Sequence, residues 1–502
     1  MDADKIGTVL LLCITLPVVK ASKSSPESEC GAPRPNIILF NADDMGYADI
    51  ASYGHPSQEW GPIDDMAIQG MRFTNFYAPS STCTPSRAGL LTGRMPQRSG
   101  VYGEGRVFFP SSTNGLPRED VTMAEALKDE GYATGFVGKW HLGVNAHSHN
   151  DGEHLPYNHG FDYVGTNLPL SNGWHCDEEK WHMSAPVSLM CLLYKNATIY
   201  QQPYSHYHMS EAFVDDAIDF MRVLSNKGSH SSCRYGDMIR EMSWSVGAIM
   251  DEVKRLGEDS NTISIFTSDN GPHLQLCNEG GDAGVLKGGK MQFWEGGIRV
   301  PGIFRWTGHI PPAKISDEVV SQLDIFPTLM SIVGGSVPDD RKMDGQDISS
   351  TLFNWSPEPQ PEPVAEKQLY KEHVITNTNL EKEGNYAEPG RCGDGGFPLD
   401  NNVNCGGCNE TGCVTNYETP LMYNICKDPN EAYPLNVSLP EHKAVLDEMV
   451  PKLEAFKADM VIAPPLLDSK SNANVPCCTP ETFPVCTCNY VYEGPVPHPG
   501  SA

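Results

Sequence analysis

The stretch from Cys83 to Arg94 reads Cys-Thr-Pro-Ser-Arg-Ala-Gly-Leu-Leu-Thr-Gly-Arg, which places a reactive side chain at the start of a predicted helix. Pro85 fixes φ and interrupts any helix that arrives from the N-terminal side. The free N–H groups and the positive end of a helix dipole bind anions. Arg87, four residues after Cys83, adds a guanidinium on the same helical face. The stretch therefore predicts a nucleophile beside an anion-binding helix start.

Two clusters of oxygen ligands follow apolar runs of the sequence. Asp43-Asp44 comes after the run 36–40, and Asp269-Asn270 comes after the run 261–267. A single Asp-Asp pair is most often a solvated turn or a helix cap. Because two such clusters stand at equivalent strand ends, we favour a metal site. Hard oxygen ligands without histidine or thiolate suit Ca²⁺ or Mg²⁺ rather than zinc.

A third polar cluster follows the short apolar run 133–137. Lys139 and His141 are two residues apart and point to the same side of an extended backbone. A lysine can bind an anion, while a neutral imidazole works as a base near about pH 6–7. The pair therefore predicts anion binding combined with proton transfer.

The three apolar runs also predict the fold. Each is continuously apolar, which is typical of strands buried on both faces of a parallel α/β sheet, and ligands bind beyond the carboxyl ends of such strands. Amphipathic helices are expected over 210–223 and 236–256. Between them, 224–235 contains no apolar run long enough for the strand that an alternating α/β chain expects there.

The composition limits the class of partner. A chain of 502 residues accommodates one large domain and a smaller one. The net charge of −28 argues against nucleic acid and anionic membranes as partners. An anionic substrate would need a local cluster of lysine, arginine or metal to overcome this field.

The N-terminal stretch 6–19 is apolar and is followed by Lys-Ala-Ser. Its length suits the core of a signal peptide and is too short for a spanning helix, so residues 1–22 are expected to be a signal peptide. No other apolar run reaches about 18 residues, so we expect no membrane span. Glycosylation sequons agree with a secretory route that ends in the lysosome or outside the cell; they lie at Asn196, Asn354, Asn409 and Asn436.

Of the 16 cysteines, 14 remain when Cys13 in the expected leader and Cys83 are set aside. Cys405-x-x-Cys408 lacks the matching second half of a zinc site, so disulfides are the better interpretation in a secreted chain. We expect a catalytic domain over 34–355 and a smaller Cys-rich C-terminal domain over 364–502. The Pro/Glu-rich piece 356–363 would connect them, and 440–460 is expected to be helical.

Three segments carry a resemblance to a known family. The Cys83 stretch matches the C-x-P-S-R-x-x-x-x-T-G-R signature of the type I sulfatases, and residues 131–143 match their second signature in full. Residues 287–301 resemble the family's lysine-before-E-G-G segment, with Lys290 in the functional position and Lys287 as the alternative register. Within the family, the 158–176 stretch and the Cys-rich tail look most like the arylsulfatase A branch.

This resemblance implies an α/β fold of the alkaline-phosphatase kind, with a mixed sheet sandwiched by helices and a smaller C-terminal α+β unit. It implies that Cys83 is converted to formylglycine by the formylglycine-generating enzyme, and that the hydrated aldehyde attacks the sulfur of a sulfate ester. It also implies one Ca²⁺. The implied metal ligands are Asp43, Asp44, the modified Cys83, Asp269 and Asn270.

The resemblance further implies roles for the remaining residues of the site. Arg87 would stabilise the diol, Lys139 and Lys290 would hold the sulfate oxygens, and His141 would take a proton as sulfate departs. Ser171, which aligns more loosely, would contact the formylglycine. The implied substrate is a sulfated small molecule, glycolipid or glycan, and a homo-oligomer is left open.

Two alternatives stay open at this point. A phosphodiesterase or phosphatase of the same superfamily would use Thr or Ser with two zinc ions, although the sequence offers no His/Asp zinc set. The family also takes an active-site histidine from a strand and loop that 224–235 lacks. The second alternative is therefore an inactive or impaired secreted relative, or a truncated splice or gene-model form.

Overall fold

The structure is a computed structural model of the chain. It describes every residue except 1–10, 18–33, 104, 172–180, 183–184, 187–190, 205–208, 226–237, 275–279, 340, 354–369, 378–413, 485 and 490–502.

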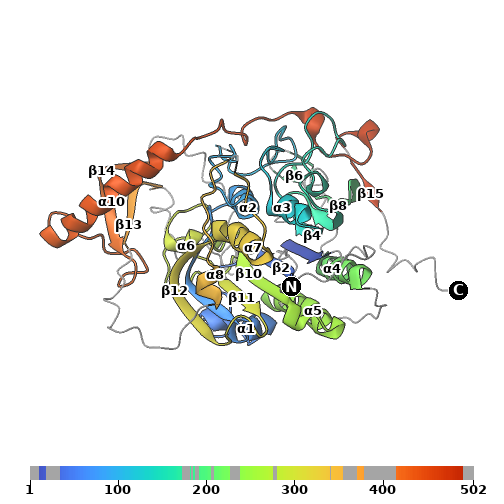
Figure 1. The fold of residues 1–502 in the computed structure, drawn as a ribbon. Helices are drawn as coiled ribbons and strands as arrows, with labels where there is room; N and C mark the ends of the chain where they lie inside the picture. Colours follow the sequence, from blue (N-terminus) through green and yellow to red (C-terminus); the bar gives the residue numbers. More distant parts are fainter. Residues whose placement is uncertain are drawn as a thin grey trace.

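An eleven-stranded mixed sheet forms the core of the molecule (Figure 1). Its strands in spatial order are β12 (Lys314–Ser321), β3 (Met71–Tyr77), β11 (Gly302–Trp306), β10 (Thr262–Ser268), β2 (Asn36–Ala42), β1 (Leu11–Pro17), β4 (Tyr132–Lys139), β5 (Tyr163–Leu168), β8 (Leu193–Lys195), β9 (Thr198–Gln202) and β15 (Cys488–Asn489). The pairs β12–β3, β10–β2 and β4–β5 are parallel, and the other neighbours are antiparallel.

Helices cover both faces of this sheet (Figure 1). On one face, Ile37 and Leu39 of β2 share a hydrophobic cluster with α2, α3 and α7. On the other face, Ile38 and Phe40 of the same strand pack with α1, α4 and α5. Successive side chains of one strand thus enter two cores, which requires a continuously apolar sequence. The helices are α1 (Pro62–Ile68), α2 (Cys83–Thr92), α3 (Met123–Asp129), α4 (Met209–Ser225), α5 (Met238–Leu256), α6 (Glu295–Ile298), α7 (Ile325–Val333) and α8 (Ser349–Phe353).

The three strands expected from the sequence are confirmed as β2, β4 and β10. β10 pairs in parallel with β2 over seven register positions, from Thr262 opposite Asn36 to Ser268 opposite Ala42. β4 lies one strand away on the other side of β2. The mixed sheet between helical layers is also the fold class that the sequence predicts.

Part of the stretch expected as a signal-peptide core lies at the centre of the sheet in the full-length chain. Leu11–Pro17 forms β1, which pairs antiparallel with β2 over five residues and with β4 over six. A leader core and an inner strand of a sheet are both short, continuously apolar runs, so one sequence pattern suits both. The helices expected over 210–223 and 236–256 correspond to α4 and α5. The stretch 224–235 between them falls mostly outside the described residues.

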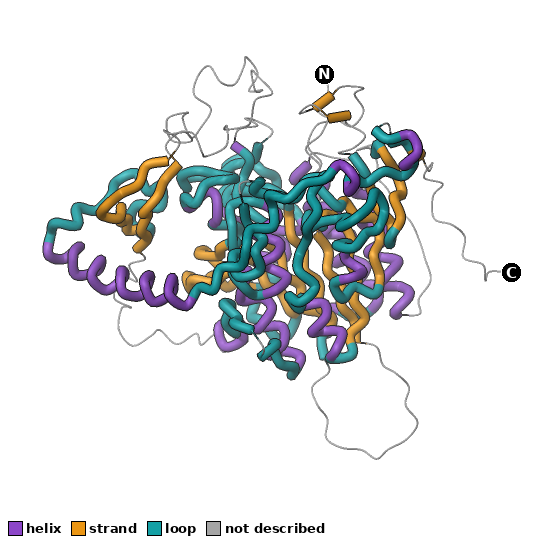
Figure 2. The backbone as a smooth tube through the Cα atoms, turned by 90° about the horizontal axis from the view of Figure 1, so that it is seen from above, coloured by secondary structure: helices purple, strands orange, loops and turns teal. Residues whose placement is uncertain are grey.

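The C-terminal region adds a hairpin and a long helix beside the main body (Figure 2). The hairpin pairs β13 (Tyr370–Asn377) with β14 (Val414–Asn424), and the helix is α10 (Pro440–Asp459), as the sequence predicts for 440–460. A separate two-stranded antiparallel ribbon pairs β6 (Trp181–His182) with β7 (Ala185–Pro186). The expected connection over 356–363 lies outside the described residues.

After α10 the chain returns across the main body, and this tail contains two disulfides. The N–H of Leu466 donates a hydrogen bond to the carbonyl of Gly100. Further along, β15 pairs with β9 at the edge of the sheet. Disulfides join Cys477 to Cys486 and Cys478 to Cys488, which confirms disulfide chemistry for the tail. The cysteines between 392 and 413 lie outside the described residues.

Two further expectations concern the surface. Within the part of the chain that the structure describes, no helix has the length and apolar character needed to cross a membrane. Asn196, in the turn between β8 and β9, and Asn436 are exposed, whereas Asn354 and Asn409 lie outside the described residues.

Candidate active site

The polar ends of β2 and β10 are joined directly to each other. The N–H of Asp269 donates to the carbonyl of Ala42 at 3.0 Å, and the N–H of Asp44 donates to Oδ1 of Asp269 at 3.1 Å. Parallel strands bring their carboxyl ends to one edge of the sheet. The two oxygen-ligand clusters predicted from the sequence therefore form a single group.

Cys83 is the first residue of α2 and points at this group. Its side chain is buried, and Sγ lies 3.7 Å from Oδ1 of Asp44. Burial raises the pKa of the thiol to about 12, against the opposing charges of Lys139 and Lys290. The residue is therefore a neutral thiol at physiological pH, which is a poor nucleophile in its unmodified form.

Arg87 lies one turn further along α2 and is completely buried. Its Nε donates to Oδ2 of Asp269 at 2.9 Å, and its Nη2 lies 3.2 Å from Oδ1 of Asp43. Its Nη1 donates to the carbonyl of Lys139 at 2.8 Å. One planar guanidinium thus fixes α2 against the ends of β2, β4 and β10, which a lysine could not do.

Two lysines pair with the two adjacent aspartates. Nζ of Lys139 lies 2.5 Å from Oδ1 of Asp43, and Nζ of Lys290 lies 2.6 Å from Oδ1 of Asp44. Burial alone would raise the pKa of both carboxyls, but these lysines, with Arg87 at Asp43, outweigh it and lower both pKa values. Both aspartates are therefore ionised.

Lys290, rather than Lys287, is the lysine of the site. The ammonium of Lys287 lies 3.5 Å from the ring centroid of Trp294, a cation–π contact. The turn that carries Lys290 is held by the Lys290 N–H, which donates to Pro272 O at 2.8 Å. The loop after β10 also packs directly on α6, because a Cβ added to Gly271 would lie 1.8 Å from Gly296 O.

His141 has a defined tautomer. Its Nε2 lies 3.1 Å from the carbonyl oxygen of Phe108, which can only accept, so Nε2 carries the proton. Nδ1 then bears a lone pair, and it is buried with no hydrogen-bond partner among the described residues. Burial, together with the charge of Lys139, holds the pKa of His141 well below its ordinary value. His141 is therefore a neutral base with one available nitrogen.

Thr84 links this histidine to the Cys83 turn, and the sequence motifs give it no role. Its hydroxyl donates to the carbonyl of His141 at 2.7 Å and accepts from the N–H of Phe108 at 3.3 Å. Gln322 is a second residue that the sequence analysis missed. Its Nε2 donates to Ser268 O at 2.6 Å, beside the metal-ligand candidates. No sequence motif points to Gln322. Thr84 stands within the Cys83 signature, but at a position where the signature specifies no residue type.

The side chains present suit a bound cation. Oxygen and sulfur atoms of Asp43, Cys83 and Asp269 lie within 4.8 Å of one another. Asn270 donates from Nδ2 to Asp44 at 2.8 Å, whereas its Oδ1 is buried with no hydrogen-bond partner among the described residues. An orphaned buried acceptor is costly unless a ligand satisfies it. The donor set of carboxylates and one amide oxygen suits a hard cation.

Backbone strain is concentrated at the same place. Asp44, His141 and Met291, the neighbour of Lys290, have φ values of 58°, 59° and 71°. Such left-handed conformations are uncommon for residues with a Cβ and cluster at functional sites. This observation supports the site independently of any motif.

Ser171 is the predicted site residue that the structure does not connect to the others. Ser171 lies two residues after Pro169, whose carbonyl accepts a hydrogen bond from the N–H of His141 at 3.2 Å. The side chain of Ser171 is partly exposed. Among the described residues, no hydrogen bond joins Ser171 to Cys83 or to the carboxylates.

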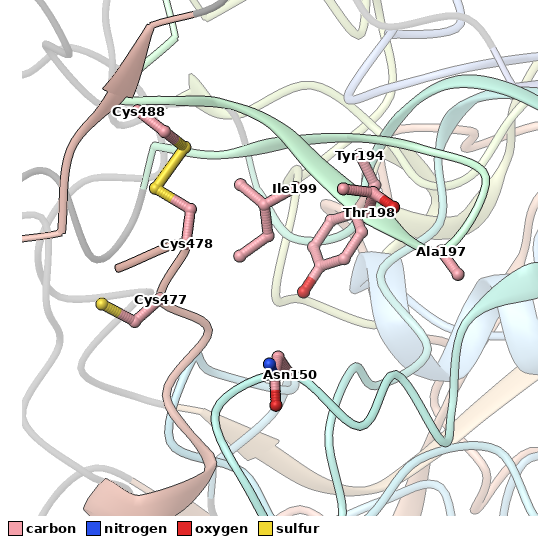
Figure 3. A pocket seen from close by; sticks show the side chains of 8 residues that line it. All are labelled: Asn150, Tyr194, Ala197, Thr198, Ile199, Cys477, Cys478 and Cys488. Carbon is pink, nitrogen blue, oxygen red and sulfur yellow. A yellow bond between two sulfur atoms is a disulfide. The ribbon is translucent and has the colours of Figure 1, made fainter. Parts of the chain in front are cut away.

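A separate cavity of about 360 Å³ lies between the β8–β9 hairpin and the disulfide-bonded tail (Figure 3). Tyr194, Ile199 and the Cys478–Cys488 disulfide contribute to its lining. None of the predicted site residues lines this cavity. The candidate active site is therefore defined by its converging charges and not by this hollow.

Buried histidines near the site predict a loss of stability in acid. His159 is fully buried against Trp140, with ring centroids 5.5 Å apart, and burial lowers its pKa from 6.5 to about 3. The unfolded chain therefore takes up the proton first as the pH falls, so the free energy of unfolding decreases below about pH 6.5. From pH 7 to pH 5, His159 alone should contribute a loss of about 2 kcal/mol.

Urea denaturation of the wild type and of His159→Phe at both pH values measures this contribution. The variant should lose about 2 kcal/mol less than the wild type between pH 7 and pH 5. Equal losses in the two proteins would show that the pKa of His159 is the same in the folded and unfolded chain.

The fold has known relatives among solved structures. The PsFucS1 sulfatase from Pseudoalteromonas sp. superposes with a TM-score of 0.63 at 23% identity, covering 86% of this chain and 92% of that one. The phosphonate monoester hydrolase of Agrobacterium radiobacter superposes with a TM-score of 0.52 at 18% identity, covering 85% and 96%. The fold is thus the alkaline-phosphatase-like α/β fold.

Sequence comparison then defines the family. The Sulfatase family matches residues 35–233 and 230–335, and a family described as the C-terminal region of aryl-sulfatase matches residues 358–488. The two parts of the first match meet within the stretch 226–237 that the structure does not describe. This chain belongs to the sulfatase family.

Individual relatives are similar over almost their whole length. An arylsulfatase of Hemicentrotus pulcherrimus is 42% identical over 94% of this chain and 90% of the relative. Arylsulfatase A of Bos taurus is 33% identical over 92% and 96%, and steryl-sulfatase of Homo sapiens is 31% identical over 80% and 84%. The chain is accordingly a sulfuric ester hydrolase of the arylsulfatase type, and the family implies a metal and a formylglycine.

Proposed function

We propose that this chain hydrolyses aryl sulfate esters with a formylglycine derived from Cys83 and with one Ca²⁺. The observation that carries the proposal is the position of Cys83 at the start of α2, 3.7 Å from Asp44 and surrounded by buried cations. A thiol whose pKa is about 12 is a poor nucleophile, which favours chemistry that begins with conversion of the side chain.

The residues around Cys83 supply binding and proton transfer. The formylglycine would supply a hydrated aldehyde whose hydroxyl attacks sulfur. Lys139 and Lys290 hold the sulfate oxygens, and Arg87 fixes the helix start from which the nucleophile projects. Nδ1 of His141 accepts a proton at the nucleophile, because Thr84 ties this histidine to the Cys83 turn. Ser171 remains proposed as a looser contact of the nucleophile.

The local charge explains how an acidic protein binds an anionic substrate. The net charge of −28 repels sulfate esters at long range. Lys139, Lys290 and Arg87 converge within the site, where Lys139 and Arg87 are completely buried. Buried charges are screened much less by salt than surface charges, so the site can capture an anion despite the global field.

Comparing two substrates tests the proposed reaction. Purified protein from secretory cells should hydrolyse nitrocatechol sulfate and show much weaker turnover of nitrophenyl phosphate. A preference for the phosphate would favour the phosphatase alternative, whose fold is shared by the phosphonate monoester hydrolase. The arylsulfatase relatives support the catalytic interpretation, and nothing in the comparisons supports the non-catalytic alternative.

Removal of the metal should abolish activity. We propose that Asp43, Asp44, Asp269 and the orphaned Oδ1 of Asn270 hold the ion, with the matured Cys83 beside it. Dialysis against a chelator should inactivate the enzyme, and Ca²⁺ should restore it, with Mg²⁺ as a weaker substitute. Elemental analysis should find one equivalent of calcium. One equivalent of zinc, without calcium or magnesium, would contradict the assignment.

The proposal also covers the substrate, the maturation, the location and the domain division of the chain. The natural substrate is a sulfated small molecule, glycolipid or glycan, and maturation requires the formylglycine-generating enzyme. The tail disulfides and the exposed sequons at Asn196 and Asn436 support a lysosomal or extracellular location. We propose the division into 34–355 and 364–502 as the catalytic and C-terminal domains.

A further inference from the structure

His273 lies at the site, but no sequence motif singles it out. It is the third residue after Asn270, in the loop that follows β10. The carbonyl of the preceding residue, Pro272, accepts a hydrogen bond from the Lys290 N–H at 2.8 Å. A Cβ added to Gly46 would lie 3.0 Å from the ring of Pro272. The backbone that carries His273 is therefore held between the Lys290 turn and the loop after β2.

The imidazole of His273 has a buried nitrogen without a protein partner. Its Nε2 forms no hydrogen bond with any described residue. Burial and the charge of Lys290 lower the pKa of His273 to about 4, while Asp44 opposes them. The ring is therefore neutral near pH 7. A buried polar nitrogen without a partner costs stability, and at His273, unlike His159, the neighbouring charges of Lys290 and Asp44 place that nitrogen where a bound substrate can satisfy it.

The two histidines of the site belong to different sides of it. His141 is joined to the Cys83 turn by Thr84, so it stands with the nucleophile. His273 instead belongs to the β10 loop that holds Lys290, and the strongest charges acting on it are those of Lys290 and Asp44. In an in-line displacement the leaving oxygen departs on the side away from the nucleophile. Among the residues that the structure describes, His273 and Lys290 are the groups that we place on that side.

We propose that His273 is a further catalytic residue, whose imidazole N–H donates a hydrogen bond to the leaving oxygen of the sulfate ester beside Lys290. As the attacking oxygen of the nucleophile bonds to sulfur, the S–O bond to the alcohol breaks and its electron pair stays on the leaving oxygen. The hydrogen bond from His273 strengthens as negative charge develops there. No proton leaves the imidazole in this step. The inference rests on the proposed sulfate-ester hydrolysis and adds a residue to it.

The test is the dependence of the rate on the leaving group. We would measure kcat/KM for wild type, His273→Ala and His273→Gln on aryl sulfates from nitrophenyl sulfate, a good leaving group, to phenyl sulfate, a poor one. His273→Ala should lose about 10- to 100-fold on phenyl sulfate and much less on nitrophenyl sulfate. His273→Gln, whose amide can still donate, should recover part of the loss.

His159→Gln is the matched control, because His159 is also a buried histidine with a lowered pKa and both its ring nitrogens lack partners among the described residues. It should alter thermal stability without changing the leaving-group dependence. Equal losses on all aryl sulfates in His273→Ala, or no loss, would overturn the role of His273 while wild-type activity stands. A wild type inert toward every aryl sulfate would instead overturn the proposed function itself, and this inference with it.

Discussion

Replacing Cys83 with serine should reduce sulfate-ester hydrolysis by at least ~10³-fold, because the nucleophile is lost while the binding groups remain. The substitution is nearly isosteric at a fully buried position, and the serine hydroxyl can take over the contact of Sγ with Asp44. Thermal unfolding should therefore change little. Turnover of nitrocatechol sulfate and a melting curve on the same preparation check both expectations.

Cys426→Ser provides the matched control. It makes the same chemical change at an exposed position just after β14, outside the site. Its activity should equal that of the wild type. Full activity in Cys83→Ser would show that this residue is not the source of the nucleophile, and a collapsed melting temperature would assign it a structural role instead.

Deleting residues 1–22 should destabilise the folded chain by more than about 5 kcal/mol, which is the lower end of the stability of a whole domain. Strand β1 lies within these residues and pairs with both β2 and β4. Its removal leaves backbone N–H and C=O groups unpaired on two buried strands, each at a cost of about 1–3 kcal/mol. Urea denaturation of the full-length and the shortened chain measures the difference.

N-terminal sequencing of protein secreted by the producing cells complements this comparison. If the stretch 6–19 acts as a signal peptide, the mature chain lacks β1, and the gap between β2 and β4 must be filled in another way. A mature protein without residues 1–22 that is as stable as the full-length chain would contradict the role of β1 in the sheet.

The central strands and the charged group at their ends could be predicted from sequence. β2, β4 and β10 are continuously apolar, and each ends in a polar cluster that the fold brings to one edge. Three site residues lie within motifs of fixed spacing, so residue type and spacing were enough to predict that they belong to the site: Arg87, Lys139 and Lys290. The choice between Lys287 and Lys290 needed the structure, because both precede the same Glu295 segment.

The rest could not be predicted for physical reasons. β1 has a composition that suits both a leader and a strand, and its pairing with β2 and β4 is not encoded in that composition. Thr84 and Gln322 act through hydrogen bonds to segments distant in the sequence, and such bonds leave no periodic pattern in it. The proposed role of His273 depends on the structure, because only the structure shows that its buried Nε2 has no hydrogen-bond partner among the described residues.

Mass spectrometry of the peptide that contains Cys83 tests the central claim most directly. In protein made by secretory cells, the account predicts an aldehyde at this position, present as formylglycine or its hydrate, in the same preparations that hydrolyse aryl sulfates. Unmodified cysteine throughout an active preparation would contradict the account, because the account assigns the nucleophile to the aldehyde made from Cys83 and not to its buried thiol.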